Sequence, residues 1–128
     1  MRSFMITTLG LAVLALGPSA AGLAAQAADG QEQEFTAQVV DVACYTVHDL
    51  QGEDHRMCAQ VCADQGVSLV LLDSEGRLYH PVGMDMPSSG DEENEQLRPH
   101  AERQVNVRGT VIDRGGLRTI VLADVSGA

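Results

Sequence analysis

Residues 104–125 read Q-V-N-V-R-G-T-V-I-D-R-G-G-L-R-T-I-V-L-A-D-V, and this stretch decides the fold class. Apolar and polar residues alternate over 104–113, as in a strand that buries one face. The R-G-G turn at 114–116 reverses the chain, and residues 117–125 return as a second strand. Gly109, in the middle of the first strand, predicts a bulge or sharp bend of the kind that small barrels require.

Three more strands are expected earlier in the chain. Residues 35–43 are rich in β-forming residues and predict a long first strand. Residues 67–73 and 77–82 predict a hairpin around the Ser-Glu-Gly turn at 74–76. Pro81 lies near the end of this hairpin, where its missing N–H group is tolerated.

Two helices are expected between these strands. Asp54 is a favourable N-cap and Gly66 a favourable C′ residue, so residues 55–65 predict about three turns of helix. One narrow polar stripe of this helix would face solvent, while the other side chains would face inward. The stripe comprises Arg56, Gln60 and Asp64. Residues 92–98 predict a short second helix.

These elements predict a mainly β fold. The arrangement is a small five-stranded OB-like barrel with a helix inserted between strands 1 and 2 and a short helix before strand 4. An open α+β sheet is the alternative. Residues 35–126 would form this single domain, preceded by a mobile N-terminal tail at 28–34.

The first 27 residues have the features of a secretory signal peptide. Arg2 supplies the positive charge, residues 9–16 supply an apolar segment, and Ala25-Gln26-Ala27 supplies a cleavage site. We therefore expect export to a bacterial periplasm or to the outside. No second apolar segment follows, so no membrane span is expected in the mature chain.

The composition excludes several kinds of partner. The chain contains 8 basic and 18 acidic side chains, for a formal charge of −10, and none of the basic ones is lysine. An acidic surface repels nucleic acids, and an aromatic content of 3% leaves few rings for stacking on bases. We therefore expect no nucleic-acid partner, and another protein of the cell envelope is the candidate partner.

The most distinctive segment spans residues 44–62, which hold all three cysteines and two of the four histidines. On the predicted helix, His55, Cys58 and Cys62 lie at positions i, i+3 and i+7 and point within an arc of about 60°. Cys44 ends the first strand and can return opposite that face. Three thiolates and one imidazole suit zinc or copper.

Two further residues are candidates for this site. His48 is a possible fifth ligand. Asp41 is a candidate to hydrogen-bond a ligand histidine without binding the metal itself.

A disulfide is the alternative use of the same cysteines. Exported proteins meet an oxidising environment, and Cys44 can pair with either Cys58 or Cys62 and leave one thiol free. Such a bridge would stabilise the domain by about 3 kcal/mol. The protein would then be a non-catalytic interaction module of the envelope. Thiol redox activity is a third possibility.

A second set of soft ligands follows the third strand. The sequence H-P-V-G-M-D-M-P contains His80, Met84 and Met86 within seven residues. Imidazole and thioether groups are ligands that copper accepts.

The segment C-Y-x2-H-x6-H-x2-C-A-x2-C, followed by G-R-L-Y and V-x-V-x-G-T-V-x-x-R-G-G, resembles a group of small exported bacterial proteins of uncharacterised function. The resemblance covers most of the chain after residue 39, and it implies an OB-like fold and export. No hydrolase, metalloprotease or phosphate-loop signature is present, so no catalytic residue is predicted. The sequence therefore predicts an exported metal-binding protein with a structural or metal-handling role.

Overall fold

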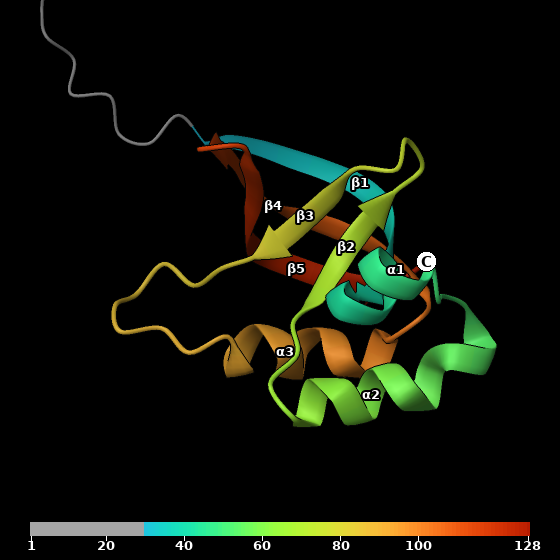
Figure 1. The fold of residues 1–128 in the computed structure, drawn as a ribbon. Helices are drawn as coiled ribbons and strands as arrows, with labels where there is room; N and C mark the ends of the chain where they lie inside the picture. The colour runs from blue at the N-terminus through green and yellow to red at the C-terminus, as the bar shows by residue number, and fades with distance from the viewer. Residues whose placement is uncertain (1–29) are drawn as a thin grey trace, which may run out of the picture.

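Five strands form a sheet that closes on itself. The computed structural model describes residues 30–128, so the expected signal peptide at 1–27 lies outside the described residues. The strands follow one another in the order β1-β2-β3-β5-β4, and β4 pairs back with β1 (Figure 1). β3 and β5 run parallel, and the other neighbours run antiparallel. The strands are β1 Gln31–Asp41, β2 Leu69–Asp73, β3 Leu78–Pro81, β4 Gln104–Arg114 and β5 Leu117–Gly127.

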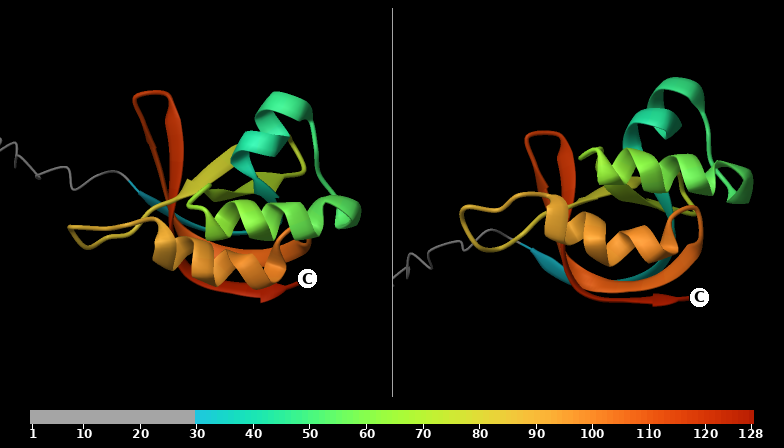
Figure 2. Two further views of the ribbon diagram at one scale, coloured as in Figure 1. Left: turned by 60° about the horizontal axis from the view of Figure 1, so that its bottom comes forward. Right: turned by 90° about the horizontal axis from the view of Figure 1, so that it is seen from below.

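Short helices connect the strands. In Figure 1, α2 and α3 lie side by side below the strands, and Figure 2 shows α1 standing next to α2. None of the helices in residues 30–128 is long and apolar enough to cross a membrane. The mainly β class, with helices after β1 and before β4, is confirmed. The helices are α1 Val42–His48, α2 Arg56–Asp64 and α3 Asp91–Leu97, with 3-10 turns η1 Glu53–His55 and η2 Arg98–His100.

The core lies inside the closed sheet and beneath the helices. All five strands contribute buried apolar side chains, and Ala59 and Ala63 of α2 pack against them. These small side chains let the helix approach the strands closely. Leu97 of α3 is fully buried in the same cluster. The helices are therefore fixed to the sheet by apolar contacts, and this gives the segment after β1 a defined position.

The predicted bulge at Gly109 is confirmed. The pairing of β4 with β5 shifts register between Arg108 and Gly109. A Cβ atom at Gly109 would lie 2.9 Å from Cγ1 of Ile120 and would also meet the carbonyl oxygen of Val121. Glycine is needed here because β5 crosses too closely for any side chain.

The first strand differs at both ends from the expected 35–43. It begins at Gln31, because residues 31–34, expected in the N-terminal tail, pair with residues 108–111 of β4. It ends at Asp41, because the Asp41 carboxylate accepts hydrogen bonds from the backbone N–H groups of Ala43 and Cys44 at 2.8 and 2.9 Å. This N-cap starts α1, a helix that the sequence analysis missed.

The helix expected at 55–65 exists, but it begins and faces differently. Residues 53–55 form the turn η1 without a side-chain cap, so Asp54 does not serve as the N-cap. Gly66, at φ 87°, follows the helix as expected. Met57 and Val61, expected to face inward, are 77% and 55% exposed.

The polar stripe of α2 bonds to η2, although Asp64 at its end stays exposed to solvent. Arg56 donates to the carbonyl oxygen of Pro99, and Gln60 donates to that of Arg98. The Arg98 guanidinium forms two hydrogen bonds with Asp64, at 2.6 and 2.8 Å. The sequence does not indicate these contacts, because the partner residues lie about forty residues further along the chain.

Candidate metal centre

Asp41 positions Cys44 by starting α1. Its carboxylate is fully buried, and Oδ1 accepts the two backbone hydrogen bonds that begin the helix. The thiol of Cys44, three residues later, is half-buried on the side of α1 that faces α2. Oδ2 of Asp41 is buried without a hydrogen-bond partner. One oxygen of this carboxylate therefore shapes the backbone, and the other is left next to the cysteines.

η1 and α2 supply the opposite side of the centre. His55 ends η1 and is only 8% exposed, and its Nε2 atom is buried without a hydrogen-bond partner. Cys58 is exposed one helical turn later, and Cys62 is half-buried after a further turn. A buried imidazole nitrogen without a partner is unusual, because buried polar atoms in folded proteins are almost always hydrogen-bonded.

The potential ligand atoms form two groups that share Cys44. In the first group, Cys44 Sγ, a ring nitrogen of His55 and Cys58 Sγ all lie within 4.8 Å of one another. In the second group, a carboxylate oxygen of Asp41 and the sulfurs of Cys44 and Cys62 lie within the same distance. Each group thus contains one residue, His55 or Asp41, with a buried side-chain atom that has no hydrogen-bond partner.

Three of the four residues predicted as ligands, Cys44, His55 and Cys58, lie close together. Cys62 instead belongs with Asp41, and the reason is the rise of the helix. His55 and Cys62 point in similar directions, but seven residues separate them by about 10 Å along the axis. Helical direction therefore places the two side chains on one face, but the axial distance keeps them in separate groups.

The other two candidates also have defined positions. His48 is exposed at the end of α1, and it belongs to neither ligand group. Asp41, predicted to support a ligand histidine, lies instead with Cys44 and Cys62 as a possible ligand itself.

Asp41 also affects the acidity of the thiols. The Asp41 carboxylate next to the Cys62 thiol, together with desolvation, raises the pKa of Cys62 to about 12. Desolvation and the nearby charge of Asp41 raise the pKa of Cys44. Without a cation both groups therefore stay protonated at neutral pH, since the negative carboxylate opposes a second negative charge. A bound cation would reverse this effect.

All three cysteines are free thiols in the structure. The sulfur of Cys44 lies within 4.8 Å of both the Cys58 and the Cys62 sulfur. Each of the two pairings considered from the sequence therefore joins neighbouring thiols, and Cys44 is the shared member of both.

Glu102 holds the loop between α1 and η1 in place, and the sequence analysis did not identify it. Its Oε2 atom accepts a 2.7 Å hydrogen bond from the backbone N–H of Gly52 and a 3.3 Å bond from Gln38. Glu102 is buried and adopts a positive φ of 59°. No local signal marks it, because its partner Gly52 is fifty residues away in sequence.

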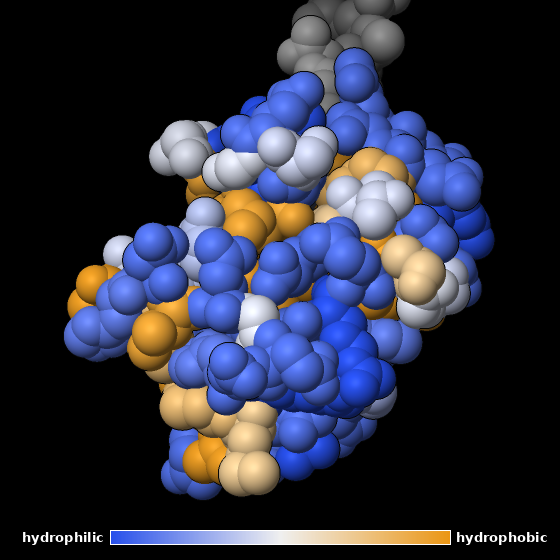
Figure 3. Space-filling model, turned by 90° about the vertical axis from the view of Figure 1, so that its right-hand side faces the viewer, coloured by the Kyte–Doolittle hydropathy of each residue, from blue (hydrophilic) through white to orange (hydrophobic). Residues whose placement is uncertain are grey.

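The surface around the centre is partly apolar. Figure 3 views the side that carries α1 and the start of α2, where apolar side chains interrupt a mainly hydrophilic surface. The exposed large apolar side chains of this segment are Val47, Leu50, Met57 and Val61.

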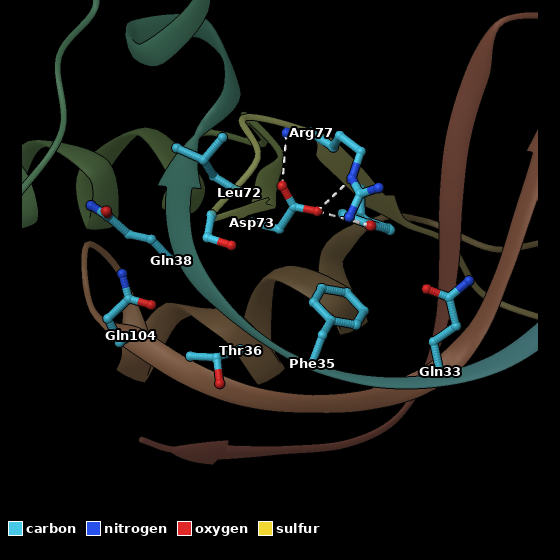
Figure 4. A pocket seen from close by; sticks show the side chains of 10 residues that line it. Gln33, Phe35, Thr36, Gln38, Leu72, Asp73, Arg77 and Gln104 are labelled. Carbon is cyan, nitrogen blue, oxygen red and sulfur yellow. Dashed lines mark hydrogen bonds and ion pairs between the residues drawn. The ribbon is translucent and has the colours of Figure 1, made fainter.

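A separate hollow lies against β1, β2 and β3. It measures about 460 Å³ and is lined mainly by polar side chains. Figure 4 shows Asp73 bonded to Arg77 at its edge, and Tyr79 donates a 3.0 Å hydrogen bond to the same carboxylate. These charges are already paired within the hairpin, so the hollow offers no free ionic group for a ligand.

Comparisons with known proteins give no match: no protein-family model, no curated protein and no solved structure is significantly similar to the chain. The function is therefore inferred from the residues and their geometry.

Proposed function

We propose that the chain is a small exported metal-binding protein, with zinc or copper held by Cys44, His55 and Cys58. Two thiolates and one imidazole form a ligand set that both metals accept. The role is metal handling or structural stabilisation in a bacterial envelope. Export rests on the signal-peptide features of residues 1–27 and on the resemblance to small exported proteins.

The observation that carries this proposal is the buried Nε2 atom of His55. It has no hydrogen-bond partner, although its residue is 8% exposed and belongs to a group with two thiols. Leaving such a nitrogen unpartnered costs about 1–3 kcal/mol. A metal ion would satisfy it and would also stabilise the thiolate forms of both cysteines.

The geometry is compatible with a metal after a small adjustment. Tetrahedral zinc, with bonds of about 2.3 Å to sulfur and 2.0 Å to nitrogen, spaces its ligand atoms by about 3.5–3.8 Å. The three atoms here lie within 4.8 Å of one another, so shifts of about 1 Å are sufficient. Side-chain rotation supplies shifts of this size without moving the backbone.

The exposure of Cys58 favours a handling role over a purely structural one. Structural zinc sites are closed, whereas here one thiol ligand is accessible to solvent. Three ligands also leave a coordination position open. An incoming thiolate from a partner protein could occupy that position and take over the metal.

We infer that the scaffold is an OB-like barrel. The support is the strand order β1-β2-β3-β5-β4 with closure onto β1, together with the helix α3 between β3 and β4. α1 and α2 would then be an insertion between β1 and β2, and it carries every ligand of the proposed centre.

The test compares two histidines of the same segment. His55→Gln should lose most of the metal that wild-type protein retains after reduction and dialysis, as measured by elemental analysis. His48→Gln is the matched control, because His48 is exposed and outside the ligand group, and it should retain the metal. Equal metal content in the two variants would contradict the assignment of His55.

The cysteines test the ligand set and the disulfide alternative together. Cys58→Ser should lose metal, while Cys62→Ser should retain it, because Cys62 lies with Asp41 rather than with His55. A count of one free thiol in metal-free protein purified without reductant would instead support the disulfide-stabilised interaction module.

A further inference from the structure

A second set of potential ligands surrounds a cavity between the end of β3 and the start of α3. The cavity measures about 270 Å³, and His80, Met86 and Glu93 line it. These three residues come from a strand, a loop and a helix, so the fold and not the local sequence brings them together. None of them belongs to the centre at Cys44.

His80 has one ring nitrogen committed and one free for a ligand. Its Nδ1 atom lies 2.9 Å from the carbonyl oxygen of Pro81. A carbonyl can only accept, so Nδ1 carries the hydrogen and donates it. Nε2 of the neutral ring then carries a lone pair, and the hydrogen bond from Nδ1 to Pro81 fixes the orientation of the ring. Histidines that bind metals are commonly held by such a hydrogen bond to the backbone.

Glu93 contributes a buried oxygen that nothing in the described chain satisfies. The residue is 8% exposed, and its Oε2 atom has no hydrogen-bond partner. Its Oε1 atom lies 2.9 Å from the position that a Cβ at Gly83 would take, and the Ser88 hydroxyl lies against that same position. Gly83 and Ser88 both line the cavity, so the carboxylate is directed into the cavity wall. A buried carboxylate is costly unless a cation or hydrogen bonds compensate it.

Met86 places a thioether at the mouth of the cavity. It is 87% exposed and lines this cavity, whereas Met84 lines neighbouring hollows and not this one. Thioethers are ligands for copper, and imidazole nitrogen suits copper as well. Magnesium and calcium prefer oxygen ligands, so the sulfur and the nitrogen argue against both.

We propose that His80 Nε2, Met86 Sδ and a Glu93 carboxylate oxygen bind one copper ion in this cavity. The positive charge of Cu(I) neutralises the buried carboxylate and leaves an uncharged site. This site is independent of the Cys44 centre, so either can exist without the other.

The test follows the methionine methyl groups of the full chain by NMR. Reduced protein carrying [methyl-13C]methionine is titrated anaerobically with Cu(I), supplied as its acetonitrile complex, beyond the amount that the thiols take up. The Met86 methyl signal should shift, and the Met84 signal should stay in place. Met84 is an internal control because it shares the same loop and is similarly exposed.

Three variants decide which residues bind. His80→Ala and Glu93→Gln should each weaken the Met86 response by at least about tenfold in Cu(I) concentration, since even supporting residues of metal sites contribute about 10–100-fold. Glu95→Gln removes the same charge from the exposed side of α3 and should leave the response unchanged. Unchanged amide signals from the strands establish that each variant is folded. If one of the two ligand variants does not fold, the other still decides.

Two results would overturn the proposal. Met86 could remain unshifted when the thiols are saturated, in which case the cavity does not bind copper. Met84 and Met86 could instead shift together in wild type and in Glu93→Gln, in which case the loop thioethers bind copper without the cavity.

Discussion

Replacing Asp41 by asparagine tests how this carboxylate controls the thiols. Asparagine has the same shape, and its amide oxygen can still accept from the N–H groups of Ala43 and Cys44, so α1 should persist. The negative charge next to Cys62 disappears, however. Because the interaction with Asp41 is the largest cause of the raised pKa of Cys62, this pKa should fall from about 12 towards its ordinary value of 9.0.

The size of the effect follows from the shift. A full return over about three pH units would raise the thiolate fraction at pH 8 by roughly 1,000-fold. Desolvation also raises this pKa and is unchanged by the substitution, so we expect an increase of about 10- to 1,000-fold. Only the thiolate reacts with alkylating reagents, so the rate of alkylation should rise by a similar factor.

The assay is iodoacetamide labelling of reduced, metal-free protein at pH 8, with mass spectrometry of peptides to follow Cys62 separately from Cys58. Asp49→Asn is the matched control, because it removes one exposed acidic charge at the other end of α1. Circular dichroism checks that both variants keep their helices. An alkylation rate of Cys62 that is the same in both variants would refute the role assigned to Asp41.

Three further predictions concern the scaffold. Asn94→Ala should lower the free energy of unfolding, measured in urea, by about 2–4 kcal/mol, because it leaves the buried N–H of Leu69 and the carbonyl oxygen of Val67 without their partner. A loss below about 0.5 kcal/mol, the effect of an ordinary surface substitution, would contradict this prediction. Burial would raise the pKa of Asp73, but hydrogen bonds from Arg77, Glu75 and Tyr79 outweigh burial and hold this pKa below its usual range. The Asp73 carboxylate therefore contributes stability above about pH 4, and this stability is lost as the pH falls through the lowered pKa. Urea midpoints between pH 2 and 6 should therefore depend less on pH in Asp73→Asn than in wild type, and parallel curves would argue against it. Gly109→Val should destabilise the protein by at least about 1–3 kcal/mol, because its side chain meets Ile120 and the backbone of Val121, and an unchanged thermal midpoint would show that β5 can move away.

The sequence was a good guide where partners are close along the chain. The hairpin of β4 and β5 and the bulge at Gly109 followed from alternation and from one glycine. α1 was missed because the valines before and after Asp41 read as one continuous strand. Asp41 is a residue type that favours N-caps, so a signal was present, but its burial and its use as a cap depend on where β2 and α2 lie.

The candidate centre could be predicted in part for the same reason. The approach of His55 to Cys58 is a local property of helical spacing, and Cys44 was placed opposite them by the short connection. The grouping of Cys62 with Asp41 required the end of β1 to lie beside the second half of α2, which no local pattern specifies. Glu102 and Glu93 could not be identified from sequence, because their role comes from contacts made by distant segments.

Asp41 therefore links folding and chemistry in one side chain. One oxygen ends β1 and starts α1, which brings Cys44 to α2, and the other oxygen is left unpartnered beside the thiols of Cys44 and Cys62. A cation at either ligand group would draw on Cys44, and so would either disulfide. Because Cys44 has one sulfur, a bond from Cys44 to Cys58 or Cys62 removes a thiolate from the metal. Metal binding and disulfide formation must then compete for Cys44, and loaded protein should resist oxidation of its thiols more strongly than metal-free protein.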